Sequence, residues 1–190
     1  MKNSLVIATR RSPLALRQTE LVKDHLLNTL KGVTFEILEM VTTGDQKREI
    51  SLEKEGGKGL FTKEIEDALL DNRADLAVHS AKDLPTETPK GLVFAGFLKR
   101  EDPADVLVLR QGFSNPNIVA TGSPRRRAQL QRIFPNVHFI DFRGNVETRL
   151  EKIARGDADA TVLAAAGLNR LGISGYDKLI FKTLPIEEMV

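Results

Sequence analysis

The chain has 190 residues, enough for one large domain or two small ones. Its formal net charge is only +2 and aromatic residues make up 5%, which disfavours a surface that stacks many nucleic-acid bases. It contains no Cys, which excludes disulfides and thiolate metal sites, and its three His, at positions 25, 79 and 138, lack the spacing of metal ligands. The apolar run before Arg10 is too short for a signal peptide and no segment reaches transmembrane length, so we expect a cytoplasmic protein without membrane contact.

Strand and helix patterns alternate along residues 1–98. We predict strands over 5–8, 35–41, 76–78 and 92–98, and helices over 13–30 and 60–70. The first helix follows Ser12-Pro13, a favoured N-cap and first helical residue. Residues 42–59 predict a long polar loop whose GGKG at 56–59 lacks the Walker spacing. A flexible connection, or a lid that carries Lys54 and Lys58 over a substrate, is about equally favoured for this loop.

A charged segment, KREDP at 99–103, predicts a boundary between a first domain over 1–98 and a second over 99–190. In the second domain we predict strands over 106–109, 118–121, 137–142 and 161–164, and helices over 124–133, 146–154 and 165–171. This alternation indicates an α/β fold with a largely parallel sheet in each half.

Polar side chains follow the apolar run in ADLAVHSAKDLP, residues 74–85. Ligands of open α/β sheets bind at the carboxyl ends of the strands, so Ser80, Lys82 and Asp83 are candidate site residues. Taken alone, a salt-bridged Lys82–Asp83 pair at a strand end is somewhat favoured. The position after a buried strand raises the odds of a functional role.

A short internal similarity relates the two halves. VIATRRSP at 6–13 and IVATGSPR at 118–125 both read as a strand, a Ser-Pro pair and a helix. Because a helix N-terminus attracts anions, Arg10 with Ser12, and Thr121 with Ser123, are candidate anion sites. Chance similarity and serine caps beside solvated arginines are the alternatives.

Further arginines lie near predicted strand ends. Arg125-Arg126-Arg127 begin a helix, where positive charge opposes the macrodipole, so a polyanion ligand is favoured over a purely structural role. Arg143 and Arg149 surround Gly144, which indicates a tight turn or close backbone approach, whereas Arg170 could simply complement a helix end. We infer a multiply charged carboxylate or phosphate bound between two lobes. A lone carboxylate there, Asp83, should stay ionised and suit a cationic intermediate or an N–H donor.

Six segments along the chain together resemble one protein family. The segments ATRRSPLAL, GGKGLFTKEIEDALLDNRADLAVHSAKDLP, KREDPADVLV, ATGSPRRRAQL, FRGNVETRL and AAAGLNRLG are similar, in order, to the porphobilinogen deaminases, also called hydroxymethylbilane synthases. The resemblance implies two lobes like those of type II periplasmic binding proteins, each a mixed, mostly parallel sheet flanked by helices, joined at a hinge with the active site between them. It also implies a monomeric transferase that condenses four porphobilinogen units into a linear tetrapyrrole and releases ammonia.

The resemblance also assigns roles to residues. Asp83 would be the catalytic carboxylate that stabilises a positively charged azafulvene, a form of preorganised charge. The carboxylate groups of substrate or cofactor would be held by Arg10, Ser12, Ser80, Lys82, Thr121, Ser123, Arg125, Arg126, Arg143, Arg149 and Arg170. Lys54, Lys58 and Phe61 would lie on or beside a mobile loop over the site.

The sequence departs from the family pattern in one large respect. The family carries a dipyrromethane cofactor as a thioether on a Cys of a third domain, and this chain has no Cys. We therefore expect the third domain and a return segment of the first domain to be missing, and the chain alone to be inactive. Smaller departures are Ala81 and Gly122-Ser123-Pro124.

Two other functions compete with this interpretation. A two-lobe module that binds anions or solutes without catalysis is one, although such a receptor gains nothing from the Asp83 carboxylate. Nucleic-acid binding through Arg125–Arg127 is the other, and we expect no such partner because charge is balanced and aromatic residues are few.

Overall fold

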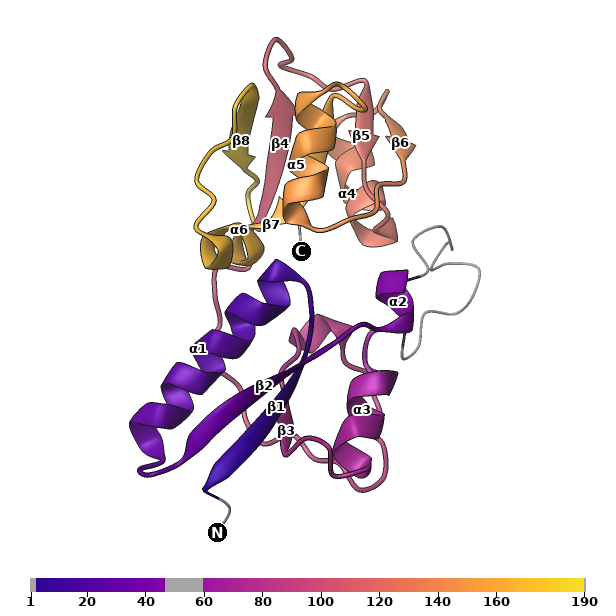
Figure 1. Cartoon of the computed structure of the whole chain (residues 1–190). Coiled ribbons are helices and arrows are strands. Elements are labelled where there is room, and N and C mark those ends of the chain that lie inside the picture. Colours follow the sequence, from indigo (N-terminus) through magenta and orange to yellow (C-terminus); the bar gives the residue numbers. More distant parts are fainter. Residues whose placement is uncertain (1–2, 47–59, 190) are drawn as a thin grey trace. The chain divides into compact units, whose positions relative to one another are not determined.

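The computed structural model describes residues 3–46 and 60–189, and it divides the chain into two compact units, Met1–Leu98 and Lys99–Val190. Each unit has its own sheet and helices (Figure 1). Both are α/β, as the alternation of patterns predicts. Lys54 and Lys58 lie outside the described residues.

The first unit is built on three parallel strands in the order β2-β1-β3. Its strands are β1 (Ser4–Arg10), β2 (Thr34–Met40) and β3 (Leu76–Ala77), and its helices are α1 (Pro13–Thr29), α2 (Thr43–Gln46) and α3 (Lys63–Leu70). A 3₁₀ turn over Ala81–Asp83 follows β3.

The helices α1 and α3 cover opposite faces of this sheet. The Ala8 side chain packs in a buried cluster with Ile65 and Ala68 of α3. The neighbouring Thr9 side chain faces the other way and donates a hydrogen bond to the Ala15 carbonyl of α1 at 3.5 Å. Because successive strand residues point to opposite faces, β1 is buried between the two helices.

The second unit contains a five-stranded mixed sheet in the order β6-β5-β7-β4-β8. Its strands are β4 (Asp105–Arg110), β5 (Ile118–Ala120), β6 (His138–Ile140), β7 (Ala160–Ala164) and β8 (Leu179–Thr183), and its helices are α4 (Pro124–Ile133), α5 (Val146–Ala154) and α6 (Ala165–Leu171). Strands β5, β6 and β7 are parallel, and β4 runs antiparallel to β7 and β8.

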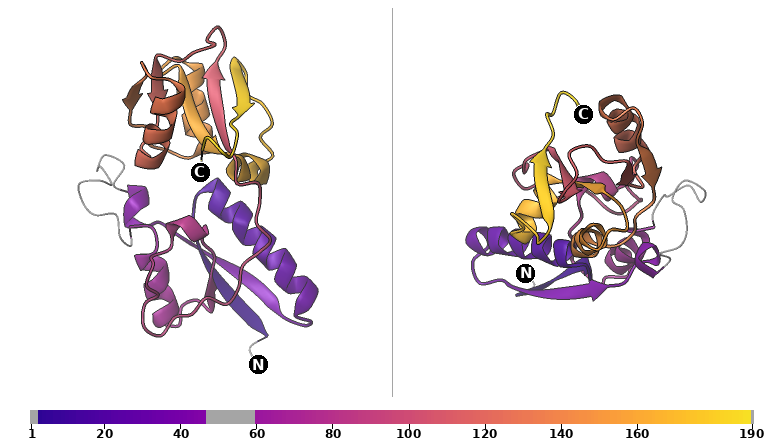
Figure 2. Two further views of the ribbon diagram at one scale, coloured as in Figure 1. Left: turned by 180° about the vertical axis from the view of Figure 1, so that it is seen from behind. Right: turned by 90° about the horizontal axis from the view of Figure 1, so that it is seen from above.

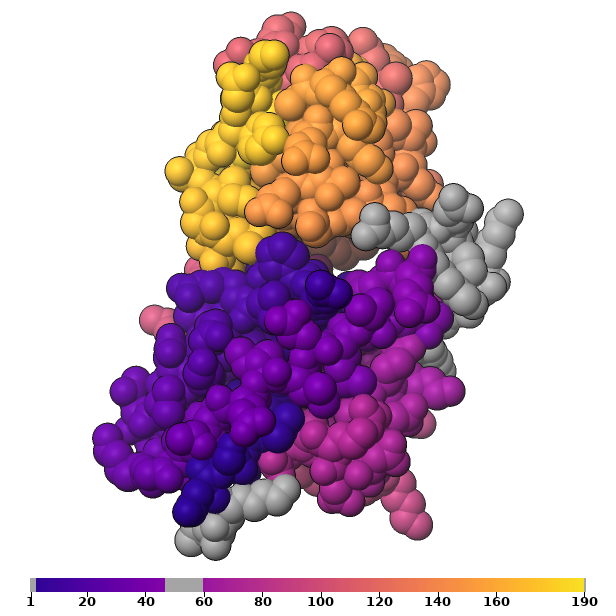
Figure 3. All heavy atoms as spheres, viewed as in Figure 1, coloured from indigo at the N-terminus to yellow at the C-terminus, as the bar shows by residue number. Residues whose placement is uncertain are grey.

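This sheet is also covered on both faces. On one face Leu107 and Val162 pack with Leu130 of α4, and on the other Val106 packs with Leu150 of α5. Helix α5 lies in front of the sheet in Figure 1, and after a half turn α4 lies in front (Figure 2, left). The residues of α5 form much of the visible surface of this unit in Figure 3.

The predicted strand over 92–98 is wrong. Residues 92–98 have no strand conformation. In the described sheet β3 is the outermost strand on its side, and no described strand pairs with residues 92–98. Their apolar side chains are instead exposed, Val93 at 86% and Phe97 at 74%. A strand requires a hydrogen-bonding neighbour, which local β-propensity cannot supply.

Two elements differ from the sequence interpretation in smaller ways. The predicted loop over 42–59 begins with the short helix α2, and strand β8 was not predicted at all. Strand β8 pairs along β4 at the edge of the sheet, so it too owes its conformation to a distant partner.

Candidate functional site

In the first unit, the predicted site residues Arg10, Ser80, Lys82 and Asp83 lie at the edge where the parallel strands end. Arg10 is the last residue of β1, and His79, Ser80, Lys82 and Asp83 follow β3. Because β1, β2 and β3 are parallel, these strand ends share one edge, which is where ligands of such sheets bind.

Arg10 is held by the protein itself. Its guanidinium forms a bidentate ion pair with Asp45 of α2, with Nε 3.2 Å from Oδ2, and its Cζ lies 4.4 Å from the centre of the Phe61 ring. Burial acts to raise the pKa of Asp45, but hydrogen bonds from Arg10 and Thr42 outweigh it and bring the pKa below its ordinary value. Arg10 is therefore fixed in orientation, and any ligand carboxylate must share it with Asp45.

The residues after β3 provide a carboxylate without such a partner. Ser80 exchanges hydrogen bonds with the Gln18 side chain at 2.9 and 3.2 Å. Among the described residues, no hydrogen bond or ion pair holds the Asp83 carboxylate, and Lys82 is exposed rather than paired with it. The predicted Lys82–Asp83 salt bridge does not form, since the 3₁₀ turn carries these side chains without bringing them together.

His79 lies in the electrostatic field of both neighbours. Burial lowers the pKa of His79, the Asp83 charge partly opposes this, and the Arg10 charge lowers it further. Together these effects favour the uncharged imidazole in the folded chain.

The two similar strand-to-helix turns are both capped as the sequence predicts. Ser12 accepts a hydrogen bond from the Ala15 amide at 3.3 Å, and Ser123 accepts one from the Arg126 amide at 3.4 Å. Thr121 supports the second turn by accepting from the Ser123 amide at 3.2 Å. Each serine thus satisfies a backbone donor of its helix.

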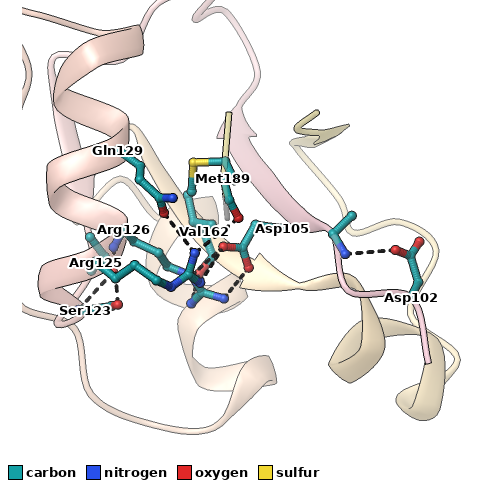
Figure 4. A network of polar contacts seen from close by, with 10 residues as sticks. Asp102, Asp105, Ser123, Arg125, Arg126, Gln129, Val162 and Met189 are labelled. Carbon is teal, nitrogen blue, oxygen red and sulfur yellow. Dashed lines mark hydrogen bonds and ion pairs between the residues drawn. The ribbon is translucent and has the colours of Figure 1, made fainter. Parts of the chain in front are cut away.

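The three consecutive arginines of α4 do not form a single cationic face. Arg125 and Arg126 both donate to Asp105 (Figure 4). Arg127 instead pairs with Asp141 and donates to the Thr121 carbonyl at 3.0 Å. The unfavourable effect of positive charge at this helix N-terminus is thus offset partly by the chain's own acids. These ion pairs give the three arginines a structural role, whereas the sequence analysis favoured a polyanion ligand over such a role.

Arg149 differs from the paired arginines of α4. It is partly buried, its Nε donates to the Gly144 carbonyl at 3.0 Å, and among the described residues it has no ion pair. Burial lowers its pKa, and the charges of Arg126 and Arg143 lower it further. Three guanidinium groups therefore share one region of the unit.

Gly144 forms the close backbone approach that the sequence indicates. It has φ +120°, and a Cβ there would lie 2.8 Å from Thr148 Cγ2. Arg170 is the basic residue in the last turn of α6. The pKa of Glu101 is lowered mainly by hydrogen bonds from Asp102 and Asn169, and the Arg170 charge adds a smaller effect.

Sequence reasoning missed the two acids that organise these arginines, Asp45 and Asp105. Asp105 carries a recognisable signal, since a carboxylate directly preceding the apolar run Val106–Leu109 is buried with that strand. Asp45 carries a weaker one, because its partner Arg10 is 35 residues away in the sequence.

Other features of the described residues do not coincide with these groups. A hollow of about 350 Å³ is lined by residues 115–117 and 133–137, where β5 and β6 begin rather than end, and no predicted site residue lines it. Over residues 3–46 and 60–189 there is no cluster of His, Cys, Asp and Glu that could hold a metal ion, and no helix is long and apolar enough to cross a bilayer.

Comparison with known proteins gives consistent matches. Residues 5–190 match the family model described as "Porphobilinogen deaminase, dipyromethane cofactor binding domain". A porphobilinogen deaminase of Synechococcus sp. (strain RCC307) is 50% identical over 179 residues, which are 90% of this chain and 56% of that protein. One of Chloroherpeton thalassium is 47% identical over 181 residues, 93% of this chain and 58% of that protein. The chain thus spans somewhat more than half the length of these relatives.

Among solved structures, the periplasmic VFT2 domain of Bordetella pertussis BvgS is similar, with a TM-score of 0.50 and 19% identity over 95% of this chain and 75% of that one. At this identity the likeness concerns the fold alone, and it agrees with the predicted resemblance to type II periplasmic binding proteins.

Proposed function

Because the chain belongs to the porphobilinogen deaminase family, we propose that it is the part of a hydroxymethylbilane synthase that holds pyrrole carboxylates. That enzyme would condense four porphobilinogen units into a linear tetrapyrrole with release of ammonia. Each unit carries an acetate and a propionate, so the bound chain gains negative charge at every step. Such a ligand requires a site where cations outnumber the protein's own acids.

The environment of Arg149 is the observation that supports this proposal most directly. A partly buried guanidinium that has no acidic partner over residues 3–46 and 60–189, near Arg126 and Arg143, costs free energy in the folded chain unless an anion joins it. Arginine is also suited to carboxylates, because its planar fork can donate two parallel hydrogen bonds.

The same group fits the dipyrromethane cofactor of the family, which carries several carboxylates. Arg126, Arg143 and Arg149 would hold these carboxylates, with Thr121 and Ser123 beside them at the start of α4. When bound, the cofactor supplies the primer to which pyrrole units are joined. The residues of this chain would orient it by charge and hydrogen bonds alone.

Asp83 supports a catalytic role in the first unit. Departure of ammonia leaves positive charge on a pyrrole ring, and a carboxylate beside that charge lowers the barrier. Asp45 is committed to Arg10, whereas the Asp83 carboxylate is not held by a described partner. We propose that Asp83 faces the pyrrole N–H and this developing charge.

The first test is a titration of the chain with porphobilinogen by calorimetry. We expect binding that Arg149→Leu weakens at least about tenfold, the effect of losing one charge-assisted carboxylate contact. Unchanged binding by the variant would contradict the role of Arg149, and tight binding of unrelated anions in preference to porphobilinogen would favour a solute-binding module instead.

The second test concerns catalysis. The 190 residues contain no Cys for a thioether to the primer, so we expect no hydroxymethylbilane from this chain alone. In a protein that joins this sequence to the cofactor-bearing domain of the family, Asp83→Asn should nearly abolish product formation while the cofactor still binds. Product from the purified 190-residue chain would refute the first expectation, and near-normal turnover of Asp83→Asn the second.

A further inference from the structure

Among the described residues of the second unit, two carboxylates are buried, Asp105 and Asp159, and they lie at opposite ends of the strands of the sheet. Asp105 begins β4 and pairs with Ala164, the last residue of β7, whereas Asp159 directly precedes the first residue of β7. Because β4 runs antiparallel to β7, its first residue reaches the edge where the parallel strands end. Asp105 therefore shares the edge of the candidate site, and Asp159 does not.

The partners of the two carboxylates differ in kind. Asp159 accepts hydrogen bonds from the backbone amides of Asn117 and Ile118 at 2.9 and 3.0 Å and from Arg110 at 3.3 Å. Its partners are therefore one arginine and the backbone at the start of β5. Asp105 instead binds two arginines of α4 at once (Figure 4).

The contacts of Arg126 fix its orientation. Its Nε and Nη2 donate to the two oxygens of Asp105, with Nε 3.0 Å from Oδ2, and its Nη1 donates to the Val162 carbonyl at 3.0 Å. A guanidinium has five N–H groups. One N–H on each Nη atom therefore has no acceptor among the described residues, and the side chain retains 14% exposure. The bidentate pair sets the plane in which these two donors lie.

Arg125 is anchored to the same carboxylate but is more open. Its Nη2 lies 3.1 Å from Asp105 Oδ2 and its Nη1 donates to Gln129 and to the Met189 carbonyl, while half of the side chain is exposed. One negative charge thus faces two positive ones. A structural anchor would need only one arginine, so the second positive charge is available to an anion.

We propose that Asp105 is a positioning residue, which holds Arg126 and Arg125 so that their remaining donors meet a ligand carboxylate. This inference rests on the proposed function and adds to it the residue that aligns the cations. Asp105 itself does not touch the ligand.

The experiment compares Asp105→Asn with Asp159→Asn, a matched loss of charge from a buried, arginine-paired carboxylate at the opposite edge. Each chain is titrated by calorimetry with porphobilinogen and with citrate, a polycarboxylate without a pyrrole, at a temperature where circular dichroism shows it folded. Both variants should have a lower Tm than the wild type. Only Asp105→Asn should also lose affinity, by about tenfold.

Asp105→Glu keeps the charge but displaces it by one methylene, so it should lose affinity by a smaller factor, and it replaces Asp105→Asn if that variant does not fold. Equal affinities of the wild type and the folded Asp105 variants would overturn the inference, because a structural anchor lowers Tm alone. A wild-type chain that binds citrate but not porphobilinogen would refute the proposed function, while the comparison of variants on citrate would still decide the role of Asp105. Binding of neither probe would overturn both.

Discussion

Gly44→Ala should destabilise the first unit, although alanine favours helices. Gly44 lies in α2, and its φ is not in the left-handed region, so the substitution should gain up to about 1 kcal/mol from helix propensity. A Cβ at Gly44 would, however, lie 2.6 Å from Phe61 Cδ1 and 2.7 Å from Cζ. Carbon atoms prefer separations of about 3.5–4.0 Å, so the ring must move by roughly 1 Å.

Movement of the Phe61 ring should cost free energy in two ways, through crowding by the new Cβ and through a weaker contact with Arg10. Overpacking typically costs about 1–3 kcal/mol, and the contact of Arg10 with the ring, 4.4 Å from its centre, is worth about 0.5–1 kcal/mol. These losses exceed the gain in propensity. We therefore expect a net loss of about 1 kcal/mol or more in the free energy of unfolding of the first unit.

Urea unfolding measures this effect by two signals. The chain has no Trp and one Tyr, Tyr176 in the second unit, so tyrosine fluorescence reports that unit while far-UV circular dichroism reports both. Gly44→Ala should shift the dichroism transition to lower urea and leave the Tyr176 transition unchanged. Gly96→Ala is the control, because a Cβ there meets no atom within 4 Å.

Combination with Phe61→Leu distinguishes the clash from other effects. If the ring is the obstacle, Gly44→Ala should cost less in a Phe61→Leu background, since the smaller side chain can yield. Wild-type stability of Gly44→Ala, or the same cost in both backgrounds, would refute the reasoning.

Three further substitutions test local features by chemical denaturation. Because burial depresses the pKa of His79 below its usual 6.5, the unfolded chain binds the proton more readily. The free energy of unfolding should therefore fall as pH drops through 6.5 towards the lower folded pKa, with a shallower slope in His79→Gln; identical slopes between roughly pH 8 and pH 5 would contradict this. Ser123→Ala should cost about 1 kcal/mol through the lost N-cap of α4, which a Ser123→Thr variant should largely restore. Gly144→Ala should cost about 1–3 kcal/mol, since φ +120° is strained for alanine and its Cβ meets Thr148, and a Tm equal to that of the wild type would show that the turn relaxes.

Local sequence signals predicted where α1 and α4 begin. They could not predict which segments form strands, because strand formation depends on a partner far away in the sequence. Ser12-Pro13 and Ser123-Pro124 mark α1 and α4 correctly, because a cap is a contact within four residues. The segment 92–98 has strand-like composition, but no strand of the described residues pairs with it, whereas Leu179–Thr183 is a strand because β4 lies beside it. Neighbours of this kind are not encoded in the segment itself.

The same division holds for the candidate site. The sequence placed Arg10 and Arg126 near strand ends, since the topology of parallel strands follows from the pattern of elements. It did not identify their acids, because the Arg10–Asp45 and Arg126–Asp105 pairs join residues 35 and 21 positions apart. A prediction from sequence thus found the cations but not the groups that orient them.

The reversed direction of β4 has a consequence for how the second unit folds. Asp105 belongs to its first strand, yet it is fixed only when β4 has paired with β7 and β8, the last two strands along the chain. Such distant pairings form only after a large loss of chain entropy. The arginines of α4 should therefore gain their final orientation late in folding, together with the whole sheet. An anion bound by them would consequently slow the opening of the entire unit rather than of one loop.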